Sequence, residues 1–226
     1  MKRLLQIWMA CLAVSLGAAP ALAEESRTGN RTPPVNTFVS NVTFVVFDTE
    51  TTGFSPTTDR IVEVGAVKFR NGEVIEEKSW LINPGRDIPY WATKVHEITD
   101  DMVKDKPTFK DIYPEFQKFI AGSVLMAHNA KFDISFVKAE IKRTGCELPP
   151  NLVIDSLSLF RKWYPKSTSH SVEAVARAAD VKTDTLHRAS ADSMYVFLIF
   201  DKSVKELNDK FKLGDIYDQC GGPLKF

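Results

Sequence analysis

The fold is decided by the stretch TFVVFDTETTG at residues 43–53. Residues 43–47 are β-branched and aromatic, which is typical of a buried strand. Asp48 and Glu50 follow at the end of this strand, and side chains two residues apart on a strand point the same way. We therefore expect both carboxylates on one face, where they would suit a hard cation, although such a pair is also common on a solvated strand edge. The turn at residues 51–53 would let the backbone approach a ligand closely.

Two further polar clusters lie at the starts of predicted helices. The sequence HNAKFD at residues 128–133 follows a short apolar run and places Asp133 in the first turn of a helix. An acid at that position is also one that the helix dipole favours without any ligand. Farther along the chain, His187 and Asp192 converge only if His187 precedes a helix, because side chains five residues apart on one helix point about 140° apart. The pattern favours such a helix, with Asp192 one turn inside it.

The remaining pattern predicts a mixed α/β sheet. Residues 60–69 form a second apolar run, and Asn71-Gly72 provides a tight hairpin turn into a third strand at residues 73–82. Three successive strands with short links indicate an antiparallel meander. In the second half, apolar runs at residues 124–127 and 152–154 alternate with helical spacing, which implies parallel strands. Helices are expected around residues 109–120, 136–141, 172–179 and 189–207.

The N-terminus has the layout of a secretory signal peptide. Two basic residues precede an apolar run at residues 4–19, and Pro20 and small residues around Leu22 follow. We expect cleavage after Ala23 and export to the periplasm or the medium. The alternative is an uncleaved membrane anchor, because residues 4–23 are about long enough to span a bilayer.

The 226 residues suffice for one domain with a sizeable core. The predicted organisation is a signal peptide at residues 1–23, a polar linker at residues 24–41, a folded domain at residues 42–207 and a C-terminal tail at residues 208–226. Two cysteines, Cys146 and Cys220, would remain after processing. An oxidising compartment would permit a disulfide between them, and two unpaired thiols are the alternative.

The charge balance limits how the protein could bind nucleic acid. The whole chain has 29 basic and 29 acidic side chains, and loss of residues 1–23 would remove two basic ones and no acid, which leaves a net charge of −2. Tight, non-specific duplex binding through a large positive field is therefore not expected. Contacts with nucleic acid would be local, with bound metal ions supplying positive charge.

Taken together, the polar clusters resemble the three exonuclease motifs of the DEDDh family, in the family's order: FDTETTG at residues 47–53, HNAKFD at residues 128–133 and HRASAD at residues 187–192. The likeness covers about residues 42–207 and is closest to the proofreading exonuclease (DNA polymerase III epsilon-like) branch. The sequence KVHEIT at residues 94–99 resembles the family's His-Gly-Ile-Thr segment, with Glu97 in place of the usual glycine.

This resemblance implies a ribonuclease H-like α/β fold, with a mixed five-stranded sheet and helices on both faces. It also implies a metal-dependent 3′→5′ exonuclease that releases nucleoside 5′-monophosphates. Asp48 would bridge two Mg²⁺ or Mn²⁺ ions, Glu50 and Asp192 would hold the first, and Asp133 would support the second through water. His187 would be the general base that takes a proton from the attacking water. An all-carboxylate site favours these ions over zinc.

The substrate contacts implied by the resemblance are Thr51, His96, Asn129 and Phe132, which would surround the terminal nucleotide. Trp91 could add stacking surface, although core packing is the preferred interpretation.

Single-stranded DNA is the expected substrate, with an exported ribonuclease or oligonucleotidase as the alternative, because a metal site does not read the sugar. A non-catalytic nucleic-acid- or polymerase-binding subunit is disfavoured, since pure binding needs no complete set of acids. No stable protein partner is implied.

Overall fold

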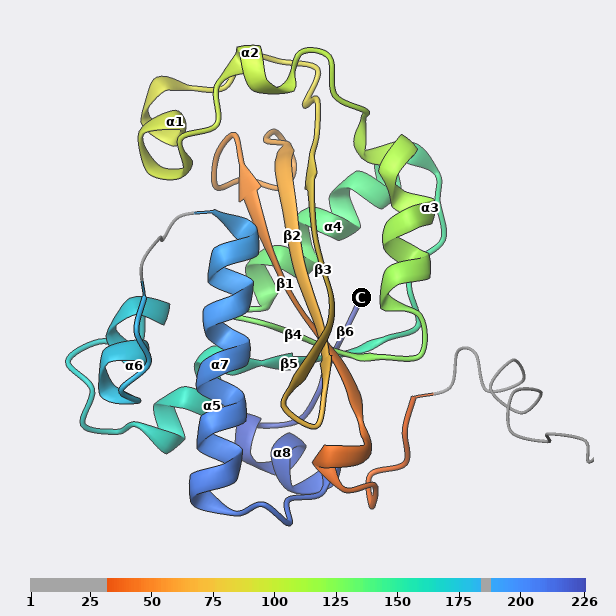
Figure 1. Ribbon diagram of the computed structural model, residues 1–226. Coiled ribbons are helices and arrows are strands. Elements are labelled where there is room, and N and C mark those ends of the chain that lie inside the picture. Colours follow the sequence, from red (N-terminus) through yellow and green to blue (C-terminus); the bar gives the residue numbers. More distant parts are fainter. Residues whose placement is uncertain (1–31, 184–187) are drawn as a thin grey trace, which may run out of the picture.

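The computed structural model describes residues 32–183 and 188–226 (Figure 1). The predicted signal peptide at residues 1–23, the first part of the predicted linker and His187 therefore lie outside the described residues. In the described part of the chain, no helix is both long enough and apolar enough to cross a membrane.

The described residues form one mixed sheet with the strand order β3-β2-β1-β4-β5-β6. The predicted antiparallel meander is formed by β1 (Thr43–Thr51), β2 (Ile61–Arg70) and β3 (Glu73–Leu81). Asn71 and Gly72 both have positive φ in the hairpin turn between β2 and β3, as a tight turn of this kind requires. The predicted parallel strands are β4 (Val124–Ala127), which pairs with β1, and β5 (Leu152–Asp155), which pairs with β4.

The sheet has one strand more than the predicted five. The sixth, β6 (Leu224–Lys225), pairs antiparallel with β5, and α8 (Leu213–Cys220) precedes it. Residues 208–226, predicted as a tail, are thus packed on the domain. The reason is the helical spacing of Leu213, Ile216 and Tyr217, which gives α8 an apolar face that it buries.

The second half of the predicted linker is also packed. Its backbone pairs with the segment before α8, where the Val39 N–H donates to the Phe211 carbonyl at 2.8 Å and the Leu213 N–H donates to the Thr37 carbonyl at 2.9 Å. Val39 is buried in the core. This segment therefore attaches the beginning of the described chain to the residues at the start of α8.

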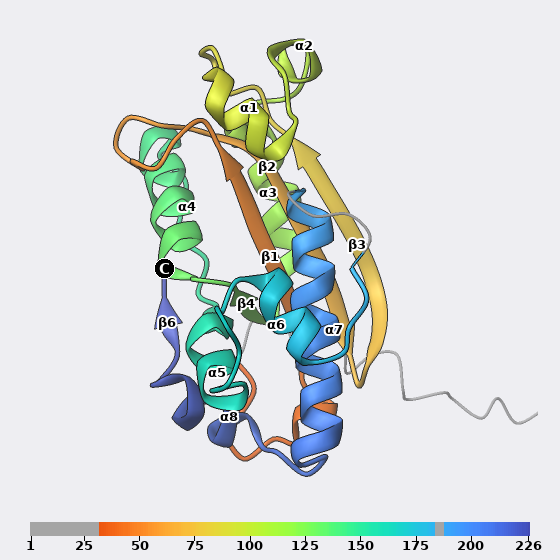
Figure 2. The same ribbon diagram turned by 90° about the vertical axis from the view of Figure 1, so that its left-hand side faces the viewer.

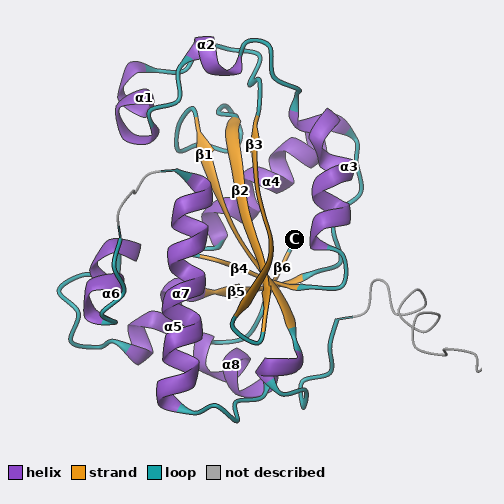
Figure 3. Cartoon of the chain, viewed as in Figure 1, coloured by secondary structure: helices purple, strands orange, loops and turns teal. Residues whose placement is uncertain are grey.

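Helices cover both faces of the sheet (Figures 1, 2 and 3). One face carries α3 (Phe109–Ile120) and α4 (Lys131–Thr144), and the other carries α5 (Ser156–Trp163), α6 (Val172–Ala178), α7 (Ala189–Leu207) and α8. Two short helices, α1 (Tyr90–His96) and α2 (Asp100–Val103), lie beyond the C-terminal end of β1. Local signals set several ends: Thr108 and Asp111 form a capping box at the start of α3, and α4 ends at Gly145, whose φ is 70°.

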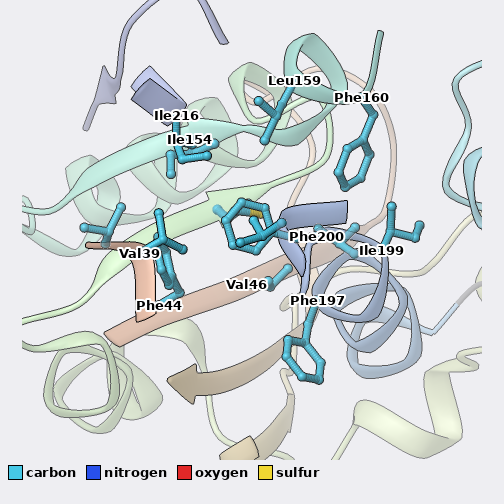
Figure 4. Close-up of a cluster of buried hydrophobic side chains, with 14 of the residues drawn as sticks. Val39, Phe44, Val46, Ile154, Leu159, Phe160, Phe197, Ile199, Phe200 and Ile216 are labelled. Atoms are coloured by element: carbon cyan, nitrogen blue, oxygen red, sulfur yellow. The ribbon is translucent and has the colours of Figure 1, made fainter. Parts of the chain in front are cut away.

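Alternating side chains of β1 enter two separate cores. Phe44 and Val46 pack with α5, α7 and α8 (Figure 4), whereas Val45 and Phe47 pack with α3 and α4. Because this alternation continues along the strand, the side chains of Asp48 and Glu50 point to the α7 side and that of Thr49 points to the α4 side. The core packing thereby determines which helix each polar side chain meets.

Cys146 and Cys220, the cysteines of the described residues, lie on opposite sides of the sheet. Cys146 packs against the core under α3 and α4, and Cys220 is buried in the core under α7 and α8. Both are free thiols, which is the second of the two predicted alternatives.

Candidate active site

Three of the predicted site residues converge where β1 meets the first turn of α7. Asp48 and Glu50 come from β1 and Asp192 from α7, and each offers a carboxylate oxygen that lies within 4.8 Å of the other two. All three side chains are half-buried. The arrangement presents three oxygen ligands to one point, as a cation site requires.

Asp133 approaches the same place from the α4 side. It lies in the first turn of α4, is 2% exposed, and accepts a hydrogen bond from Thr49 Oγ1 at 2.7 Å. Its charge raises the pKa of Asp48, so the two carboxylates interact across β1. Asp133, the fourth acid of the motif set, therefore lies beside the cluster but is not one of the three acids whose oxygens converge.

The cluster concentrates negative charge in a poorly solvated place. Burial raises the pKa of Asp48 well above its usual value, and repulsion from Asp133, Glu50 and Asp192 raises it further. Burial and the neighbouring acids raise the pKa of Glu50 to about 8. Burial raises the pKa of Asp133 to about 7, against the hydrogen bond from Thr49. Such repulsion is relieved by a divalent cation, and an all-oxygen ligand set fits Mg²⁺ or Mn²⁺.

Two of the predicted substrate contacts are built into the protein interior. Thr51 is 9% exposed, and its hydroxyl donates to the Gly53 carbonyl at 2.6 Å. His96 is 2% exposed, and its Nδ1 accepts a hydrogen bond from the Ile98 N–H at 3.0 Å. Burial lowers the pKa of His96, so the ring is neutral at pH 7. The Thr51 hydroxyl thus lies within the turn that follows Glu50, and contact of Thr51 and His96 with a nucleotide stays a prediction.

The other two predicted contacts lie nearer the surface. Asn129 is exposed and has a φ of 63° in the turn between β4 and α4. Among non-glycine residues, asparagine tolerates this conformation best, and strain of this kind is often found at functional sites. Phe132 is half-buried, with its ring 4.8 Å from that of Phe136.

The structure shows an exposed aromatic surface that includes Trp91 and, in addition, Phe54, which the sequence did not single out. Phe54, directly after the turn at residues 51–53, is 78% exposed and stacks on Trp91 of α1, with ring centroids 5.2 Å apart and planes at 16°. Tyr90 beside them is 75% exposed. Trp91 is 47% exposed, so the preferred interpretation of this side chain as core was wrong. The buried face of α1 carries Ala92 and His96, four residues apart, and this spacing was the available signal that Trp91 points outward.

Comparison with known sequences gives a consistent result. Residues 45–200 match the family model described as Exonuclease. The chain is 37% identical over 173 residues to DNA polymerase III PolC-type of Clostridium perfringens, and 39% identical over 166 residues to that of Caldanaerobacter subterraneus subsp. tengcongensis. These matches cover 76% and 74% of this chain. The chain spans only 12% of the length of either relative.

Solved structures resemble this one over most of the described chain. Exonuclease X in complex with 5′ overhanging duplex DNA has a TM-score of 0.58 at 28% identity, and the match covers 76% of this chain and 98% of that one. A zinc-bound complex of Escherichia coli exonuclease I with single-stranded DNA has a TM-score of 0.67 at 19% identity, and the match covers 75% of this chain and 42% of that one. The second likeness concerns the fold, and the predicted ribonuclease H-like architecture is confirmed.

Proposed function

Since this chain belongs to the exonuclease family, we propose that it is a 3′→5′ exonuclease that removes nucleoside 5′-monophosphates from the 3′ end of single-stranded DNA. The observation that carries this proposal is the convergence of Asp48, Glu50 and Asp192 within 4.8 Å. A non-catalytic binding subunit would have no use for such a cluster, because closely grouped, poorly solvated acids are costly without a cation.

Divalent metal ions belong to the chemistry of this family, and we propose that two Mg²⁺ or Mn²⁺ ions are used. Asp48, Glu50 and Asp192 would hold one, and Asp133 would support the other from the α4 side. When bound, such ions supply positive charge for the attacking and leaving oxygens of phosphodiester hydrolysis.

The chain's own residues have separate tasks around that centre. Thr49 holds the Asp133 carboxylate in place through its hydroxyl. Thr51 closes the turn at residues 51–53 by its hydrogen bond to Gly53. His187, five residues before Asp192 in the sequence, is the proposed general base, which would accept a proton from the attacking water.

The exposed aromatic surface supports unpaired bases as the substrate. Phe54 and Trp91 lie beside the turn that follows Glu50, and bases stack on such side chains with about 1–3 kcal/mol each, whatever the sequence. Binding by stacking suits a protein whose net charge is not positive, because it does not depend on a large positive field. Bases paired in a duplex would be less available to these rings.

We also propose that the protein is exported, on the basis of the signal-peptide pattern at residues 1–23. The test is a fusion that carries these residues: recovery outside the cytoplasm with an N-terminus at Glu24 supports export, and recovery of full-length cytoplasmic protein contradicts it.

The catalytic proposal is tested with the processed protein, residues 24–226, on 5′-end-labelled single- and double-stranded DNA and RNA, in Mg²⁺ or in chelator. Single-stranded DNA should give a ladder that shortens from the 3′ end in Mg²⁺ alone. Faster cleavage of RNA would make the protein a ribonuclease of the same family. Rapid cutting of a closed single-stranded circle would contradict an exonuclease altogether.

A further inference from the structure

A second buried acid lies beside the cluster and takes no part in the proposed chemistry. Glu63 is the third residue of β2, and its side chain is 0% exposed. It is directly opposite Glu50 in the β1–β2 register, so both point to the α7 side of the sheet. A buried carboxylate is costly unless charged and hydrogen-bonding partners satisfy it. The hydrogen-bond partners of Glu63 therefore indicate its role.

Among the described residues, three of the four hydrogen bonds that Glu63 accepts come from the beginning of α7, and the fourth comes from β3. Arg188 donates to Glu63 twice, from Nη2 to Oε1 at 2.9 Å and from Nε to Oε2 at 3.2 Å. The N–H of Ala189, the first residue of α7, donates to Oε2 at 3.3 Å, and Ser79 Oγ donates to Oε1 at 2.6 Å. Both oxygens of Glu63 are thus occupied by donors, which leaves it unsuited to be a metal ligand.

Glu63 replaces a helix cap that α7 itself lacks. The cap residue Arg188 makes no side-chain capping bond of its own, and the first N–H groups of a helix have no partner within it. The Glu63 carboxylate accepts one of them from the neighbouring strand. The Arg188 carbonyl in turn accepts the N–H of Asp192 at 3.0 Å. A short chain of bonds therefore connects Glu63 to the backbone of the proposed ligand.

A second contact fixes the same turn of α7 to β2. Gly65, opposite Asp48 in the register, has no side chain, and a Cβ there would lie 2.1 Å from the Ala189 carbonyl carbon and the Ser190 nitrogen. Ser193 Oγ donates to the Gly65 carbonyl at 3.1 Å. Figure 2 shows the first turn of α7 beside these strands. The contacts at Glu63 and Gly65 together fix the position and orientation, relative to β2, of the first turn of α7, which carries Asp192.

We propose that Glu63 is a positioning residue, which holds Arg188 and the start of α7 so that Asp192 meets Asp48 and Glu50. This inference rests on the proposed function of the carboxylate cluster as a metal site. Loss of an outer partner of a metal ligand commonly weakens metal binding by about 10–100-fold. If the role of Glu63 were purely structural, its substitution would lower stability without changing the metal affinity of the folded protein.

The chain offers a matched control in Glu140. Its side chain is 1% exposed, it accepts two bonds from Arg60 at 2.7 and 3.0 Å, and it accepts the Ile61 N–H at 3.4 Å. Burial, an arginine that donates twice and a backbone donor are therefore alike at the two positions, and the remaining partner is Arg143 at 3.2 Å for Glu140 and Ser79 at 2.6 Å for Glu63. The difference is that Glu140 braces α4 against the start of β2, whereas Glu63 holds the turn with Asp192.

The test measures Mn²⁺ affinity by titration calorimetry and the thermal midpoint in chelator, on the processed chain. Glu63→Gln should weaken Mn²⁺ binding on the order of tenfold or more. Glu140→Gln should lower the thermal midpoint about as much as Glu63→Gln does, while its Mn²⁺ affinity stays within about twofold of the parent. If Glu63→Gln does not fold, Arg188→Gln replaces it, because the Arg188 side chain is 35% exposed and should show the same loss of affinity.

Equal effects of Glu63→Gln and Glu140→Gln on Mn²⁺ affinity would overturn the inference. Parental Mn²⁺ affinity in folded Glu63→Gln would also overturn it. Where Glu63→Gln does not fold, parental Mn²⁺ affinity in folded Arg188→Gln would do the same. Failure of the proposed function has a different signature, because the parent protein itself would then neither bind Mn²⁺ nor hydrolyse DNA.

Discussion

Thr49 Oγ1 donates a hydrogen bond of 2.7 Å to Asp133 Oδ1, which joins two segments that lie 84 residues apart in the chain. Thr49 is on the face of β1 opposite to Asp48 and Glu50. The bond therefore ties Asp133 of α4 to β1 from the other face of the sheet. Burial raises the pKa of Asp133 to about 7, and the bond from Thr49 opposes that rise.

Replacement of Thr49 by valine should therefore weaken metal binding in a pH-dependent way. Without the donor, the pKa of Asp133 rises further, and protons compete better with Mn²⁺ at pH 7 than at pH 9. We expect lower Mn²⁺ affinity at pH 7, near-parental affinity at pH 9, and a free energy of unfolding lower by about 1–2 kcal/mol. Calorimetry at the two pH values measures the difference. Thr144→Val, which removes a hydroxyl bonded only to α4 carbonyls, should change neither affinity, and an equal loss at both pH values for Thr49→Val would contradict the account.

The stability of the metal-free protein should fall as the pH rises. The pKa of Glu50 is raised from 4.5 to about 8 and that of Asp133 from 3.8 to about 7, so the folded state holds protons that the unfolded state has already released. Between about pH 4.5 and 8 the unfolded state binds fewer protons, and stability therefore decreases with pH. Scanning calorimetry in chelator should show a higher thermal midpoint at pH 5.5 than at pH 8.5, and Mg²⁺ should raise the midpoint most at pH 8.5. The opposite order in chelator would argue against a repulsive carboxylate cluster.

Glu97 should be replaceable by glycine with a gain in stability. It ends α1 with a φ of 61° and donates its N–H to the Thr93 carbonyl at 2.8 Å. This left-handed conformation costs a side-chain-bearing residue about 1–2 kcal/mol, and the resemblance to the His-Gly-Ile-Thr segment places a glycine here. Urea unfolding of Glu97→Gly should show a free energy of unfolding higher by about 1 kcal/mol. Glu97→Ala keeps the Cβ and should give no such gain, and a destabilised glycine variant would show that the side chain compensates for the strain.

The exposed aromatic pair should act on substrate binding rather than on chemistry. Phe54→Ala and Trp91→Ala each remove one ring of the stack, and the loss of about 1–3 kcal/mol of stacking should raise KM for single-stranded DNA several-fold to a hundredfold. Turnover at saturation should change little. Leu148→Ala, which removes another exposed apolar side chain, provides the control in steady-state kinetics. A drop in kcat with unchanged KM would remove the rings from the binding surface.

Much of the site could be predicted because its signals are local. The alternation of residues 43–47 and the spacing of Asp48 and Glu50 indicated one face of one strand, and Asn71-Gly72 marked the hairpin that places β2 beside it. The helix lead-in before Asp192 followed from the geometry of 3.6 residues per turn. In each case the neighbours along the chain carry the information.

The rest depended on contacts between distant segments. Glu63 is an acid within an apolar run, and nothing in residues 61–67 tells that it is buried, since its partner Arg188 lies 125 residues away. The pairing of β6 with β5 involves two residues of a segment too short to have a strand period. The outward position of Trp91 depends on which face of a seven-residue helix is buried. Such features arise from packing, which a single sequence does not display.

If the carboxylate cluster holds divalent ions for hydrolysis at a 3′ end, Asp48→Asn should abolish this activity without unfolding the protein. The substitution keeps the size of the side chain and removes one of three charges that meet within 4.8 Å. On 5′-labelled single-stranded DNA with Mg²⁺, the parent should yield a ladder that shortens from the 3′ end and Asp48→Asn should yield none. The variant should remain folded with a thermal midpoint in chelator at or above that of the parent, because one repulsive charge is gone. A ladder from folded Asp48→Asn at near-parental rate would contradict the account.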